Sequence, residues 1–188
     1  VAAIVNKQKK GNIFFGHWNK LSFIMTMIGV IVCIVFLLVK KQAYRNWEKG
    51  KAYAGVNRLQ YFATLYPHLQ GELGYLFIYT HELIENEEYE VANKVLDKAT
   101  RLSSDPLIYT KIGKNYQALK QYDRAEKAYL QAAHMIPHRI YPLYLLALLY
   151  REMGDMEKAR DMARQVIDKE PKVWSPAVEE METEMKQL

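Results

Sequence analysis

The chain has 188 residues, a formal net charge of +5 and a single cysteine, Cys33. This length supplies about one domain, and one cysteine excludes an internal disulfide and a cysteine-rich zinc site. The basic excess is local, because residues 1–58 carry ten Lys or Arg and one acidic residue, whereas residues 59–188 carry 16 basic and 20 acidic residues. We therefore do not expect nucleic acid to be a partner.

The first predicted element is the apolar run at residues 21–39, which contains 19 residues and no charge. As an α-helix it would rise roughly 28 Å, which matches the hydrocarbon core of a bilayer. Aromatic and basic residues, of the kind that anchor helices at membrane interfaces, flank both of its ends. We predict an integral membrane protein with a basic juxtamembrane segment at 1–20 and a transmembrane helix at 21–39. The flanking residues are Trp18, Lys20, Lys40, Lys41, Tyr44 and Trp47.

Two other interpretations of this run are weaker. A buried core helix rarely contains so long an uncharged stretch, and a cleaved signal peptide would be shorter and followed by a small-x-small cleavage site. Basic residues flank the run on both sides in similar numbers, so the positive-inside rule leaves the side of the membrane undetermined.

Beyond the apolar run, residues recur at a spacing of 34 positions. Ala125 and Ala159 form one such pair, and Pro137 and Pro171 form another. This is the period of the tetratricopeptide repeat (TPR), a pair of antiparallel helices. Small residues allow the two helices to approach closely, and larger residues fill the space between neighbouring pairs. We therefore predict a TPR domain over 40–188.

The predicted repeats differ in how completely they match the pattern. In the first clear repeat Gly113 and Ala125 occupy small positions, and Tyr116 and Tyr129 occupy large ones. A Ser-Pro pair at 175–176 predicts the start of a final helix. The predicted elements are degenerate repeats at 44–67 and 73–105, clear repeats at 106–139 and 140–173, and a capping helix at 175–188.

Together these elements predict an all-α protein in which one N-terminal transmembrane helix precedes a TPR-type solenoid of helical hairpins with a C-terminal capping helix. In such solenoids the first helix of each pair lines the concave face, where protein or peptide partners bind. The alternative is that Tyr144 and Leu148 pack against the final helix and that this groove binds nothing. The residues expected on the concave face are Phe77, His81, Thr110, Lys114, Gln117, Tyr141, Tyr144, Leu148 and Arg151.

Motifs for catalysis, cofactors or metals are not found. His81-Glu82-Leu-Ile-Glu85 has glutamate where a zinc-protease helix needs its second histidine. His134 and His138 are four residues apart, but Pro137 interrupts the helical face that they would share. We assign no catalytic, cofactor-binding or metal-binding residue and expect no cofactor.

The runs 102–106, 113–119, 139–147 and 169–173 resemble the C-terminal region of bacterial O-antigen ligase/polymerase-type membrane proteins. Members of that family are inner-membrane enzymes that transfer glycans from a polyprenyl-diphosphate carrier, and some carry a TPR tail after their last membrane helix. The resemblance implies a bacterial inner-membrane location. It also implies that this chain, which begins at Val1 instead of Met, is a fragment of a larger protein whose catalytic residues lie upstream.

Two functions follow as hypotheses. The first is a membrane-anchored TPR scaffold for protein partners, forming the tail of a glycan-transferring membrane protein. The alternative is that the intact protein is the lipid-linked-glycan ligase or polymerase itself and that this tail only stabilises it. The two hypotheses differ on whether the protein is an enzyme. The sequence does not identify the partner, the oligomeric state or any glycan substrate.

Overall fold

The computed structural model describes the backbone of residues 2–50, 52, 56–170 and 173–188, and the side chains of these residues except 2–19 and 56–57. Within these residues it contains nine α-helices and no strand, so the predicted all-α class is confirmed. The chain forms two compact units, residues 1–49 and 50–188. Pro171 and the side chain of Trp18, both used in the sequence predictions, lie outside the described residues.

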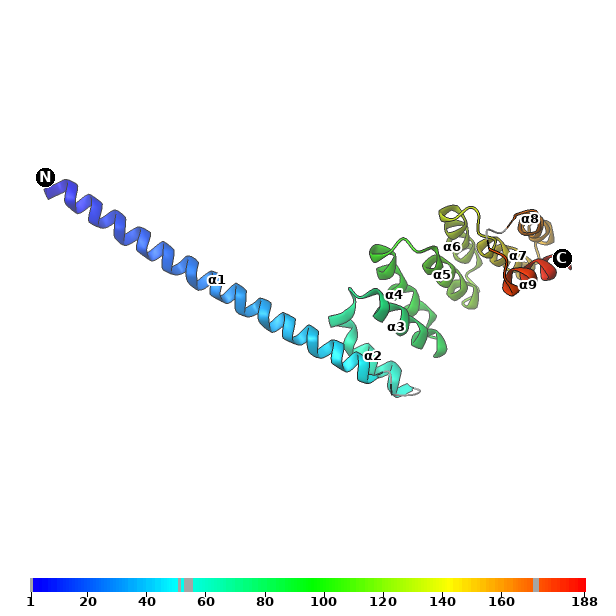
Figure 1. Ribbon diagram of the computed structural model, residues 1–188, viewed down its shortest axis with the longest axis horizontal. Coiled ribbons are helices and arrows are strands. Elements are labelled where there is room, and N and C mark those ends of the chain that lie inside the picture. Colours follow the sequence, from blue (N-terminus) through cyan, green and yellow to red (C-terminus); the bar gives the residue numbers. More distant parts are fainter. Residues whose placement is uncertain (1, 51, 53–55, 171–172) are drawn as a thin grey trace. The chain divides into compact units, whose positions relative to one another are not determined.

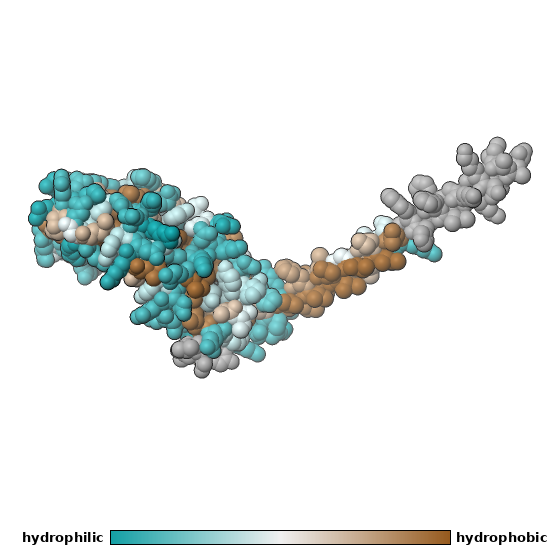
Figure 2. Space-filling model, turned by 180° about the vertical axis from the view of Figure 1, so that it is seen from behind, coloured by the Kyte–Doolittle hydropathy of each residue, from teal (hydrophilic) through white to brown (hydrophobic). Residues whose placement is uncertain are grey.

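The first unit is a single helix, α1, which spans Ala2–Gly50 (Figure 1). The predicted apolar run lies inside it, and every residue from 21 to 39 is exposed. Figure 2 shows the hydrophobic surface along this helix. Within the run, Thr26 donates its hydroxyl to the Phe23 carbonyl (2.8 Å). Within the described residues, Lys20–Gly50 is the one helical segment whose length and composition are sufficient to cross a membrane.

The second unit is built from antiparallel helical hairpins that follow one another along the chain (Figure 1). Each hairpin packs on the next because its second helix contacts the first helix of the following pair. Helix α2 packs against α3 at one end, and α9 packs against α8 and α7 at the other. The helices are α2 (Val56–Leu69), α3 (Leu73–Glu85), α4 (Tyr89–Leu102), α5 (Pro106–Ala118), α6 (Tyr122–Met135), α7 (Tyr141–Met153), α8 (Met156–Ile167) and α9 (Pro176–Met185).

Small residues occupy the centre of each hairpin, as the repeat pattern requires. Gly113 of α5 faces Tyr129 of α6 so closely that a Cβ atom there would lie 2.3 Å from the ring carbon Cε1. Ala125, Ala147 and Ala159 are completely buried. The tyrosine ring therefore fills a space that only a residue without a side chain leaves open.

The three hairpins share one turn geometry. Their turn residues Glu87, Lys120 and Gly154 have φ angles of 60°, 56° and 80°, in the left-handed region. Each of the three N–H groups bonds to the carbonyl three residues earlier, and the following N–H bonds to the carbonyl five residues before it, at 2.8–2.9 Å. This is the Schellman arrangement, which satisfies carbonyl groups at the end of the first helix.

Only the third hairpin has glycine at this position. A left-handed conformation costs roughly 1–2 kcal/mol for a residue with a Cβ atom, and glycine avoids that cost. The turn is formed in all three hairpins nonetheless, because helix packing on both sides holds it in place.

Substitutions at this position should change stability in opposite directions in two repeats. We expect Lys120→Gly to raise the free energy of unfolding by about 0.5–1 kcal/mol, because it removes the left-handed strain, and Gly154→Ala to lower it by about 1 kcal/mol. Denaturant unfolding of the full chain in detergent, followed by circular dichroism, measures both. Lys120→Ala is the control and should stay within about 0.5 kcal/mol of the parent; stabilisation by this variant as well would refute the backbone explanation.

Candidate partner-binding face

The predicted site residues lie on three helices that occupy equivalent places in the hairpins, α3, α5 and α7. We call the surface that these helices form the first-helix face. On α3, Phe77 is half-buried and His81 is exposed, with its Nδ1 atom 3.9 Å from the Glu85 carboxylate. On α5, Lys114 is exposed, whereas Thr110 is only 4% exposed and donates its hydroxyl to the Leu107 carbonyl. Thr110 therefore offers almost no surface to a partner.

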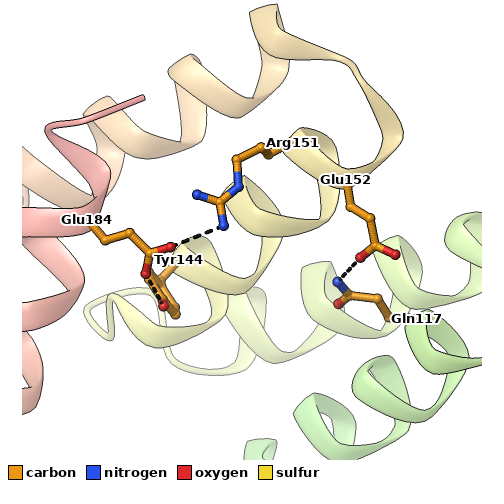
Figure 3. Close-up of polar contacts among 5 residues, drawn as sticks. All are labelled: Gln117, Tyr144, Arg151, Glu152 and Glu184. Carbon is orange, nitrogen blue, oxygen red and sulfur yellow. Dashed lines mark hydrogen bonds and ion pairs between the residues drawn. The ribbon is translucent and has the colours of Figure 1, made fainter.

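Helix α9 engages the residues predicted on α7. Tyr144 donates its hydroxyl to Oε2 of Glu184 (2.6 Å), and Arg151 donates to Oε1 of the same carboxylate (3.1 Å), as Figure 3 shows. Leu148 packs against the core to which Val178 of α9 belongs. Burial, and then the hydrogen bond to Glu184, raise the pKa of Tyr144 to about 12, so the phenol stays protonated at neutral pH.

The first half of the alternative given for α7, packing of Tyr144 and Leu148 against the final helix, agrees with these contacts. Tyr144, Leu148 and Arg151 hold the C-terminal helix of the same chain. Helix α9 also carries exposed polar residues, namely Glu179, Glu180 and Thr183.

A second polar connection joins α5 to α7. Gln117 donates from Nε2 to Oε2 of Glu152 (2.5 Å; Figure 3), and its Oε1 accepts the hydroxyl of Tyr129 (2.8 Å). The other oxygen of Glu152 accepts the hydroxyl of Tyr122 (3.0 Å), and this hydrogen bond raises the pKa of Tyr122. Gln117 thus links two helices of its own repeat to the first helix of the next one.

The two connections have the same design. Gln117 and Arg151 lie 34 residues apart, which is one repeat period. Gln117 donates to Glu152 on α7, and Arg151 donates to Glu184 on the capping helix α9. The sequence predicted both donors on this face but not their acceptors, Glu152 and Glu184. The 34-residue spacing of Gln117 and Arg151 could have indicated these acceptors, because residues at the same position of successive repeats have equivalent neighbours.

Tyr141 connects the middle of the face with its C-terminal end. Its ring stacks with that of Tyr144, with centroids 6.4 Å apart, and the Lys114 ammonium lies 5.4 Å from its centroid. Lys114 forms no ion pair with a carboxylate in the part of the chain that the structure describes. The open part of the first-helix face is therefore formed by Phe77, His81, Lys114 and Tyr141.

Among the described residues, no three His, Cys, Asp or Glu side chains are grouped in a way that could hold a metal ion. His81, His134 and His138 are all exposed.

Comparison with protein families identifies the repeats. Tetratricopeptide repeat models match residues 107–138 and 143–172, which are the hairpins α5/α6 and α7/α8. The chain therefore contains tetratricopeptide repeats, and this prediction is confirmed. No family match links the chain to O-antigen ligases or polymerases. No curated protein sequence matches it.

Solved structures of similar fold support the same architecture. MamA from Desulfovibrio magneticus RS-1 (residues 41 to the end) is 15% identical over 77% of this chain and 74% of its own, with a TM-score of 0.54. The type III secretion translocator chaperone SycD of Yersinia enterocolitica is 22% identical over 67% of this chain and 93% of its own, also at 0.54. A chain of the CopN–Scc3 complex is 16% identical over 61% and 67%, again at 0.54. At these identities the likeness shows the fold alone.

Removing the carboxylate of Glu184 should loosen α9. We expect Glu184→Ala to reduce the free energy that holds α9 in place by about 1–2 kcal/mol, because it removes one hydrogen bond and a half-exposed ion pair. Glu184→Gln retains an acceptor for Tyr144 and should cost less than about 1 kcal/mol. Amide hydrogen exchange over residues 176–185 measures both. Glu180→Ala, at an exposed acid of the same helix, is the control; equal exchange in Glu184→Ala and Glu180→Ala would show that Glu184 does not hold α9.

Proposed function

We propose that the protein is a membrane-anchored TPR scaffold that binds protein or peptide partners on its first-helix face. The observation that carries this proposal is the presence of two tetratricopeptide repeats with available side chains on their first helices. Lys114 forms no ion pair within the described residues, and the aromatic ring of Tyr141 lies beside it. Aromatic and cationic side chains on one rigid surface are typical of residues that contribute most to binding.

The binding region that we propose is the N-terminal and middle part of the face. Tyr144 and Arg151 are engaged by Glu184, so a partner would meet Phe77, His81 and Lys114 first. Proteins of similar fold include a translocator chaperone and a member of a two-protein complex, which agrees with a role in binding protein chains.

We further propose that residues 21–39 of α1 anchor the chain in a membrane. Support comes from the continuous helix, the uncharged composition of these residues and the exposure of their apolar side chains. An exposed apolar helix of this length is stable in lipid and unfavourable in water. The rival interpretation is a signal sequence, because one near the N-terminus can pass the same test of helix length and hydropathy.

A finer proposal is that the scaffold belongs to an O-antigen ligase or polymerase-like protein of the bacterial inner membrane. It rests on the sequence runs quoted above and on the order of an apolar helix followed by TPR hairpins. In that case the glycan-transferring residues would lie upstream of Val1, and the repeat domain would assemble or stabilise the enzyme. Further hydrophobic spans in the upstream coding sequence would support this proposal, and a start codon immediately before Val1 would refute it.

Charge reversal on the first-helix face should weaken partner binding. We expect His81→Ala combined with Lys114→Glu to reduce capture of partner proteins from native membranes about tenfold, which corresponds to the loss of one strong contact of about 1.4 kcal/mol. Both side chains are exposed, so circular dichroism should be unchanged. Quantitative mass spectrometry of the captured proteins gives the readout. Lys127→Glu, on the exposed side of α6, is the matched control and should capture as the parent does; an unaffected double variant would exclude this face.

Membrane anchoring should depend on the centre of the apolar run. We expect the parent chain to remain in the membrane pellet after alkaline carbonate extraction, and Ile31→Arg with Ile34→Arg to shift it to the soluble fraction. Each arginine costs about 2.5–3.5 kcal/mol at the centre of a spanning helix. The control Ile31→Leu with Ile34→Leu should stay in the pellet. Intact-mass analysis distinguishes the rival, because a cleaved signal sequence would leave a chain that lacks residues 21–39.

A further inference from the structure

A cavity of about 440 Å³ lies at the C-terminal end of the repeat domain, where the turn before α7 meets the start of α9. Its size falls within the range of about 300–1,000 Å³ that is typical of ligand-binding pockets. Five apolar side chains line it. They are Ile140 at the N-cap of α7, Tyr141 at its start, Val173, and Val178 and Met181 from α9. Because Ile140 and Val178 are also buried members of the core, these walls are rigid.

The polar lining of the cavity is basic. His138 and Arg139 line it, and no Asp or Glu is among the described residues that do. Arg139 is exposed and forms no ion pair within the described part of the chain. The N-cap residue of α9, Ser175, also lines the cavity, so the partial positive charge of this helix terminus adds to that of the arginine. The cavity is therefore apolar inside and attracts negative charge at its rim.

Two large apolar residues next to the cavity are exposed. Val173, which lines it, is 75% exposed, and Trp174 is 60% exposed. Tryptophan is enriched at protein interfaces because it combines a large apolar surface with a hydrogen-bond donor. The region thus combines a preformed cavity, exposed apolar residues and an unpaired cation.

We propose that this cavity binds an aromatic or large aliphatic side chain of an acidic peptide segment in a partner protein, with Arg139 contacting a carboxylate beside it. The proposal deepens the scaffold function proposed above and rests on it, since it names the chemistry of the bound partner. The apolar side chain gains burial against Ile140 and Met181, and the acidic flank meets the basic rim.

Defined peptides test this pairing of an apolar anchor with acidic flanks. The probe is a fluorescein-labelled pentapeptide Asp-Glu-Phe-Glu-Asp with blocked termini, titrated with the full chain in detergent micelles and followed by fluorescence anisotropy. Replacing its phenylalanine with alanine should weaken binding at least about tenfold, the equivalent of burying one apolar side chain. A Lys-Lys-Phe-Lys-Lys peptide should bind at least as weakly as the alanine peptide.

Variants of the protein locate the site. Arg139→Glu and Val173→Glu should each weaken binding of the acidic phenylalanine peptide about tenfold or more, and both side chains are exposed, so the fold should be retained. Arg164→Glu, at an exposed arginine of α8 outside the cavity lining, is the matched control and should bind as the parent does. Equal weakening by Arg164→Glu would show a general charge effect and overturn the assignment.

Peptide binding and partner capture together distinguish the cavity from the first-helix face. If the acidic peptide does not bind, or binds as well with alanine as with phenylalanine, the cavity assignment is wrong, whereas partner capture that depends on His81 and Lys114 would still stand. If the peptide binds and is sensitive to Arg139→Glu while capture is unaffected by the His81 and Lys114 substitutions, the cavity assignment holds and the first-helix face is excluded.

Discussion

The close approach of the paired helices is the constraint on which the repeat domain depends. At Gly113 the helices are so near that the Tyr129 ring occupies the space of a side chain. Because the ring is fixed there, its hydroxyl reaches Gln117, and Gln117 in turn reaches Glu152 of the next repeat. One small residue thus determines where a large one lies, and the large one orients the polar group that joins neighbouring repeats.

This chain of contacts gives residues of the first-helix face a structural task. In a solenoid each repeat contacts only its neighbours, so stability depends on the interfaces between them. Gln117 and Arg151 support these interfaces by bonding to Glu152 and Glu184. The same positions lie on the surface where partners of such repeats bind. Stacking therefore occupies Gln117 and Arg151, and the binding surface that we propose lies where the stack does not need the side chains.

The sequence predicted the helical class and the TPR repeats because packing between helices leaves a regular trace. Ala125 and Ala159 must be small in each copy, and their spacing reveals the period. Side-chain partners leave no such trace. Glu152 looks like any exposed acid of a helix, and its bond to Gln117 depends on how two repeats stack. The turns show the same contrast, since Gly154 signals a left-handed residue whereas Lys120, with φ of 56°, gives no hint of one.

Tyr141 shows how the two candidate binding regions are related. It lines the cavity beside α9, lies beneath the Lys114 ammonium of α5 and stacks on Tyr144, which Glu184 of α9 binds. A side chain in the cavity therefore contacts the ring that also borders the open part of the first-helix face. The two binding regions that we propose therefore meet at the Tyr141 ring.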